Sequence, residues 1–171
     1  SFYSGEIPDW VTPYSLNPKK PSTIYVGYRN VFKSTNRGVN WQKISSFSHN
    51  SALKTLTVAE NDTNTIYAST GSTLYVTNNG GGSWGVHYQA KNMITDVVVD
   101  DNDPSRIWIT TSGYTNNSKV FELYNGEVKN ISYNLPNVPA NTLVKLKKSI
   151  STLFVGTDVG VYYKDDFTNK W

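Results

Sequence analysis

Short runs of β-branched and aromatic residues recur along this chain, with polar turns between them. Four such runs lie at residues 23–26, 65–68, 106–109 and 152–155. Each follows a polar turn, and a further short apolar segment precedes the turn, as at residues 53–58 and 94–99. Apolar runs that alternate with such turns are typical of β-strands joined by hairpins. The pattern therefore predicts an all-β chain.

A second motif recurs downstream of these runs. Residues 31–41 and 74–84 share the order Ser/Thr, any residue, Asn, any residue, Gly, two further residues and Trp, and matched positions are 43 apart. A degenerate copy at residues 161–171 keeps the aromatic strand, the acid and the Trp. Residues 120–132 form a copy with a shortened turn and Val in place of Trp. Four copies at a regular spacing indicate four repeats of one structural unit.

Each repeat is predicted to fold as four antiparallel strands, with an Asn/Asp-Gly turn before the last, which is one blade of a β-propeller. A sandwich or a single barrel does not explain a fixed period with a Trp in it. We therefore expect one incomplete propeller domain over residues 1–171. Because both ends of the chain resemble cuts, the ring is expected to continue outside it. The blades are expected at about residues 11–47, 52–90, 93–134 and 143–171, the last without its outermost strand.

The recurring motif has a structural explanation in the turn that it forms. The Asn or Asp side chain can accept hydrogen bonds from turn amides, the hydroxyl can add another, and Gly can take a left-handed conformation at no steric cost. The Trp can bury its ring against the base of the hairpin. We expect these roles for Ser34, Asn36, Gly38 and Trp41, for Thr77, Asn79, Gly81 and Trp84, and for Asp166 and Trp171.

These motifs resemble the Asp-box, or BNR, repeats of sialidases, xyloglucan-degrading endoglucanases, sortilin-type receptors and photosystem assembly factors. The resemblance covers nearly the whole chain. Segments 7–11, 17–18, 24–28, 130–139 and 154–162 are also similar to propellers of large secreted bacterial proteins exported by type IX secretion. This second resemblance implies an extracellular or surface-displayed module within a larger polypeptide.

Composition narrows the function classes. The net charge is +3, from 13 Lys and 3 Arg against 13 acids, and the Lys residues form no block longer than two. Nucleic acid is not expected as a partner, because binding to it needs a clustered basic surface. The chain has no Cys and no apolar stretch near the roughly 18 residues of a membrane span. Neither a disulfide framework nor a membrane-spanning helix is expected.

An enzymatic function needs residues that the sequence supplies poorly. The resemblance to sialidases implies three Arg at the site, but Arg37 lies inside a hairpin turn. A glycoside hydrolase needs two carboxylates across a cleft. Asp96 and Asp158 are the weak catalytic candidates, but Asp96 has no identifiable partner and Asp158 lies in a Gly-Thr-Asp-x-Gly turn. The sequence therefore supports a catalytic role for none of these residues.

No metal site or cofactor is predicted. His49 and His87 are distant from each other and lack patterned companions, and the acidic turn at residues 100–103 lacks the ligand spacing of a calcium loop. Tyr28, Arg29 and Tyr114 lie in loops expected to join the second and third strands, and they are the binding candidates.

Two hypotheses about function remain open. The first is a non-catalytic binding or scaffolding module, whose partners are a glycan or protein ligand and the rest of the parent polypeptide. The alternative is a fragment of a propeller glycoside hydrolase acting on polysaccharide.

Overall fold

The computed structural model describes residues 5–171, which contain fifteen β-strands and no helix. The predicted domain also includes residues 1–4, which lie outside the described residues. The all-β prediction is confirmed. The strands are β1 (Tyr14–Leu16), β2 (Ile24–Gly27), β3 (Val31–Ser34), β4 (Gln42–Lys43), β5 (Thr55–Val58), β6 (Ile66–Thr70), β7 (Thr73–Thr77), β8 (Gly85–Gln89), β9 (Ile94–Val99), β10 (Ile107–Thr111), β11 (Val120–Tyr124), β12 (Glu127–Asn130), β13 (Ala140–Lys145), β14 (Leu153–Thr157) and β15 (Gly160–Lys164).

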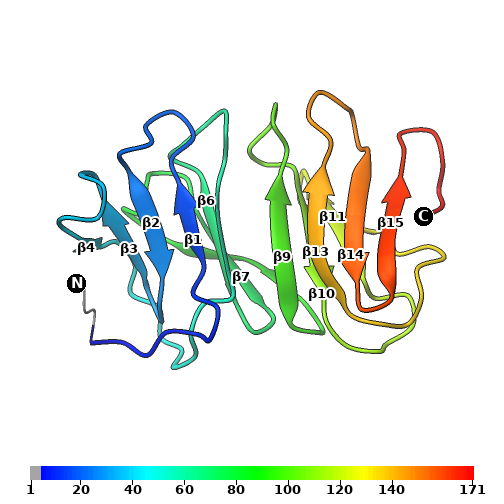
Figure 1. Cartoon of the computed structure of the whole chain (residues 1–171), viewed down its shortest axis with the longest axis horizontal. Coiled ribbons are helices and arrows are strands. Elements are labelled where there is room, and N and C mark those ends of the chain that lie inside the picture. Colours follow the sequence, from blue (N-terminus) through cyan, green and yellow to red (C-terminus); the bar gives the residue numbers. More distant parts are fainter. Residues whose placement is uncertain (1–4) are drawn as a thin grey trace.

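The strands form four antiparallel sheets, each built from strands that are consecutive in sequence. Blade 1 contains β1–β4, blade 2 contains β5–β8, blade 3 contains β9–β12, and blade 4 contains the three strands β13–β15. The first strand of each blade contacts the first strand of the next, and the blades follow one another along the molecule (Figure 1). The first strand of blade 4 begins at Ala140, three residues before the expected start of that blade.

Burial along the second strand of each blade reflects the position of the blade in this row. Every residue of β6 and of β10 is buried, because blades 2 and 3 have neighbours on both faces. In β2 and in residues 153–155 of β14, buried residues alternate with less buried ones, since within residues 5–171 blades 1 and 4 have a neighbouring blade on one face only. A strand covered on both faces is apolar at successive positions, as in residues 107–109, Ile-Trp-Ile.

Three apolar cores fill the spaces between neighbouring blades. Each large apolar side chain in them contributes roughly 1.5–3 kcal/mol through removal of its surface from water. The core between blades 1 and 2 includes Tyr25, Leu53 and Ile66, that between blades 2 and 3 includes Leu74, Ile94 and Ile107, and that between blades 3 and 4 includes Trp108, Leu143 and Leu153. The hydrophobic periodicity of the sequence thus positions one blade against the next.

The outward faces of blades 1 and 4 carry exposed apolar side chains. On blade 4 the register aligns Val144 with Phe154 and Phe154 with Tyr163, and the two rings lie 6.0 Å apart between centroids. On blade 1, Tyr14 and Leu16 are exposed on β1.

A charged network joins blades 3 and 4. The Lys145 ammonium on β13 donates a hydrogen bond to Asp101 and lies 3.7 Å from an Asp100 carboxylate oxygen. The amide of Lys148 donates to the other Asp101 oxygen at 3.0 Å. The hydrogen bond from Lys145 and the one from Lys148 lower the pKa of Asp101 from its usual 3.8 to about 2.

This lowered pKa predicts an acid-dependent loss of stability. Because the pKa of Asp101 is lower in the folded chain than in the unfolded chain, its stabilising contribution is present above pH 3.8. It is lost as the pH falls through the folded value of about 2. Thermal unfolding measured at several acidic pH values should show a smaller decrease in Tm for Asp101→Asn than for the wild type. Equal decreases would contradict the assignment to Asp101.

Candidate functional site

The hairpin between β3 and β4 is held by its own polar side chains. The Ser34 hydroxyl accepts a hydrogen bond from the Gly38 amide at 2.8 Å and donates to the Asn36 side-chain oxygen at 3.0 Å. That oxygen also accepts from the Asn40 amide at 2.9 Å. Gly38 has a left-handed φ of 88°. The hairpin between β7 and β8 repeats the arrangement with Thr77, Asn79, Gly81 and Ser83.

In the degenerate repeat of blade 4, the residue that accepts the hydrogen bond of the turn lies one position earlier than the motif predicts. Asp165 accepts a hydrogen bond from the amide of Phe167 in its own turn at 3.0 Å. Asp166, for which the motif predicted that role, accepts instead from the amides of Ile150 and Ser151 between β13 and β14. Successive side chains of an extended chain point in opposite directions, so a shift of one residue directs Asp166 to the neighbouring loop.

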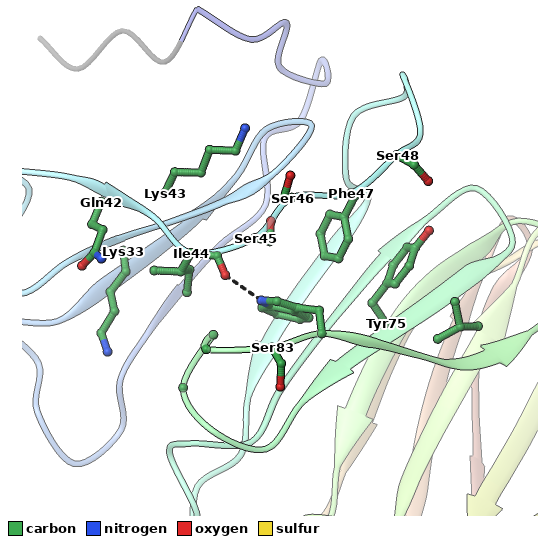
Figure 2. Close-up of a pocket in the computed structure, with 15 residues that line it drawn as sticks. Lys33, Gln42, Lys43, Ile44, Ser45, Ser46, Phe47, Ser48, Tyr75 and Ser83 are labelled. Carbon is green, nitrogen blue, oxygen red and sulfur yellow. Dashed lines mark hydrogen bonds between the residues drawn. The ribbon is translucent and has the colours of Figure 1, made fainter.

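The Trp residues of the motif link one blade to the next. The indole Nε1–H of Trp84 in blade 2 donates to the carbonyl of Ile44 in blade 1 at 2.7 Å, shown by the dashed line in Figure 2. Trp171 makes the equivalent bond from blade 4 to blade 3 at 2.6 Å. Trp41 in blade 1 donates to its own hairpin, at the Gly38 carbonyl. The sequence predicted packing against the hairpin and did not reveal the bond between blades.

A groove of about 710 Å³ lies between blades 1 and 2 (Figure 2). Strand β4 has two residues, whereas β8 has five, so blade 1 leaves part of the outer surface of blade 2 uncovered. One side of the groove is formed by β4 and the residues that follow it, and the other by β7 and the hairpin before β8. We call this the interblade groove.

Aromatic side chains form one end of the interblade groove. The Phe47 and Tyr75 rings are stacked, with centroids 4.3 Å apart, and the Trp84 ring meets Phe47 edge-on at 5.4 Å. The His49 ring lies beside both, with its centroid 5.4 Å from that of Phe47 and 5.8 Å from that of Tyr75. Burial lowers the pKa of His49, which favours the neutral imidazole. Its nitrogens are buried, and the described residues contain no cluster of three His, Cys or acidic side chains that could hold a metal.

The groove is cationic and polar at its other end. Lys33 and Gln42 are cross-strand partners and project to the same side of blade 1, whereas Lys43 points to the opposite side (Figure 2). Lys43 is paired there with Glu6, at 3.1 Å. No Asp or Glu is among the described residues that line the groove. It therefore combines aromatic rings, hydroxyl and amide groups and a positive charge, without a carboxylate.

The two carboxylates singled out in the sequence have structural contacts. One Asp96 oxygen accepts hydrogen bonds from the Leu143 amide and the Thr142 hydroxyl of blade 4, both at 2.9 Å. Asp158 accepts from the Asn141 side chain at 2.8 Å. Asp96 thus connects blades 3 and 4, and both carboxylates interact with neutral donors. Neither lines the interblade groove.

The three binding candidates lie in loops between second and third strands, as expected from their sequence positions. The partly buried Tyr28 meets Phe32 edge-on at 5.8 Å, and Arg29 lies 3.9 Å from Glu6. Tyr114 is exposed in the loop between β10 and β11. The structure does not place them in the interblade groove. Sequence reasoning missed the groove because Tyr75 and Trp84 resemble ordinary strand and hairpin residues.

Comparison with known proteins gives matches at the level of structure. No protein-family model and no curated protein matches the chain. A GH74 enzyme from Niastella koreensis superposes with a TM-score of 0.72 at 14% identity, covering 93% of this chain and 23% of the enzyme. YCF48 from Cyanidioschyzon merolae gives a TM-score of 0.65 at 11% identity, over 94% of this chain and 55% of that protein.

The extracellular domain of a hybrid two-component system from B. thetaiotaomicron also matches, with a TM-score of 0.64 at 18% identity, over 91% of this chain and 21% of that one. The chain is a partial β-propeller. At these identities the likeness establishes the propeller fold alone. The propeller blades described here span less than a quarter of the GH74 enzyme and just over half of YCF48.

Proposed function

We propose that this propeller segment is a non-catalytic recognition module that binds a glycan in the interblade groove. The observation that carries the proposal is the lining, in which aromatic rings and hydroxyl and amide groups occur together without a carboxylate. Sugar rings have apolar faces that pack on aromatic side chains, and hydroxyl groups that bond to small polar side chains. A pocket of this size with a few convergent polar groups fits a small ligand or part of a longer one.

The contacts of Asp96 and Asp158 support a non-catalytic role. A retaining or inverting glycosidase holds two carboxylates about 5 Å or about 6.5–9.5 Å apart, with a scissile bond between them. Asp96 is engaged by Thr142 and Leu143, where it aligns blades 3 and 4. We therefore assign Asp96 a structural function, and Asp158 a role in holding its loop to Asn141 of β13.

We also propose that the module is extracellular or displayed on a cell surface, within a larger polypeptide that contains Asp-box repeats and uses type IX secretion. The described residues contain no helix long and apolar enough to cross a membrane. The exposed row formed by Val144, Phe154 and Tyr163 is suited to cover by another blade of the parent polypeptide. Its remaining blades would then complete the ring.

Replacement of Tyr75 tests the proposed binding site. Affinity electrophoresis of the chain through gels that contain soluble polysaccharides should show retardation by at least one of them. Tyr75→Ala removes a ring that stacks at 4.3 Å on Phe47, and we expect an affinity about tenfold lower. Tyr114→Ala, in the exposed loop of blade 3, is the matched control and should keep the wild-type affinity.

Two results would overturn this proposal. The first is loss of retardation in Tyr114→Ala with retention in Tyr75→Ala, which would place binding on the loops between second and third strands. The second is release of reducing sugar from the retarding polysaccharide, abolished in Asp96→Asn, which would identify a glycoside hydrolase. A Tyr75→Ala chain with a normal thermal unfolding transition excludes misfolding as the cause of lost binding.

A further inference from the structure

Lys33 occupies a distinctive position in the groove. Its ammonium lies 5.6 Å from the centroid of the Tyr25 ring, and it has no ion-pair partner among residues 5–171. The adjacent Lys43 is neutralised by Glu6 on the opposite side of the sheet. Because no carboxylate lines the groove, Lys33 supplies a positive charge there that the groove itself does not compensate.

A second hollow extends the groove on the far side of Lys33. It has a volume of about 280 Å³, shares Lys33 and Gln42 with the interblade groove, and continues to Thr35, Asn40 and Trp41. Lys33 therefore borders two adjacent hollows, with Trp41 in one and the stacked Phe47 and Tyr75 rings in the other. This shape fits an extended chain better than a compact molecule, with the charge near its middle.

We propose that the ligand is a carboxylated polysaccharide, with a uronate carboxylate bound to the Lys33 ammonium and neighbouring sugar rings packed along the two hollows. This inference rests on the proposed glycan-binding function and specifies the chemical class of the glycan. An ammonium in a groove without acids favours an anionic ligand by charge complementarity. The aromatic rings with amide and hydroxyl side chains between them favour a sugar chain over an acidic peptide.

The experiment compares charged and uncharged forms of the same polysaccharides. Binding of the wild-type chain to polygalacturonate, alginate and hyaluronate is measured by isothermal titration, each beside its own methyl ester. Esterification removes the carboxylate charge and keeps the sugar backbone. We expect at least one uronate to bind about tenfold more tightly than its ester, and its affinity to decrease as salt concentration increases.

Substitution of Lys33 and of Lys43 in turn shows which ammonium group binds the carboxylate. Lys33→Met should abolish the difference between uronate and ester, while Lys43→Met should preserve it, because Lys43 faces Glu6 on the other side of the sheet. If Lys33→Met does not fold, the comparison of uronate with ester on the wild-type chain still decides the charge requirement.

The outcomes separate this inference from the proposed function. Equal binding of a uronate and its ester, or binding of neutral polysaccharides only, would leave the glycan-binding proposal standing. Either result would overturn the inference that the glycan carries a carboxylate bound to Lys33. Failure of every polysaccharide to bind would overturn both. Binding of a poly-glutamate peptide in the groove without binding of any polysaccharide would also overturn both, and would show that the partner is a protein.

Discussion

Lys145→Met is expected to lower the free energy of unfolding by about 3 kcal/mol, the low end of the range for breaking a buried ion pair from one side. The Lys145 side chain is 3% exposed between blades 3 and 4, and the Asp100 side chain near it is 5% exposed. Met retains most of the length of the side chain and removes the charge that faces Asp100 and Asp101. The main cost comes from Asp101, which loses its cation, while Asp100 keeps only Arg106 at 3.8 Å. Urea unfolding followed by Trp fluorescence measures the change.

Lys147→Met is the matched control for this prediction. Lys147 lies two residues farther along the chain and pairs with Glu60 at 2.6 Å, but its side chain is 72% exposed. Exposed pairs contribute little, because water and salt screen both charges. The urea midpoint of Lys147→Met should therefore match the wild type. Equal destabilisation by the two variants would indicate that burial between the blades does not determine the effect.

Gly81→Ala should destabilise the chain by about 3 kcal/mol. Gly81 has a φ of 99°, which costs an Ala residue about 1 kcal/mol. Its new Cβ would also lie 2.7 Å from Ile44 Cδ1 and 2.8 Å from Ile44 Cβ, so the hairpin of blade 2 would have to move away from blade 1. Overpacking of this kind costs about 1–3 kcal/mol more. The same urea experiment measures the loss.

Gly38→Ala separates the backbone cost from the steric cost. Gly38 is the equivalent position in blade 1 and has a φ of 88°, but the nearest atom to its added Cβ is a Trp41 ring carbon at 3.5 Å. Only the backbone cost of about 1 kcal/mol is expected. The gap of about 2 kcal/mol between the variants measures how closely blades 1 and 2 approach. If Gly38→Ala were as harmful as Gly81→Ala, close approach of the blades would not be the cause.

The repeat made much of the fold predictable from sequence. Matched positions such as Ser34 and Thr77 lie 43 residues apart, and this spacing predicted successive four-stranded sheets with a polar turn before each last strand. Turn chemistry acts within a few residues, so the hydrogen bonds of Asn36 and Asn79 could be anticipated from local sequence. The second strands could also be located, because each is a short apolar run after a polar turn.

Contacts between blades could not be predicted in the same way. The acceptor for the Trp84 indole is 40 residues away at Ile44, and Asp96 meets Leu143 from 47 residues away. Such pairs depend on how one sheet is placed on the next, and a pattern within one repeat does not encode that placement. The sequence did not predict the interblade groove either, because the groove depends on the shortness of β4 relative to β8.

Nuclear magnetic resonance tests the central claim, that the interblade groove is the recognition site, most directly. Amide and indole signals of the ¹⁵N-labelled chain are recorded during titration with a mixture of cello-, xylo- and galacturonate hexasaccharides. Our account predicts shifts at residues 42–48 and 80–84 and at the Trp84 indole, with the Trp108 indole in the core unchanged. Shifts confined to residues 28–30 and 111–119, or to the surroundings of Asp96, would contradict it.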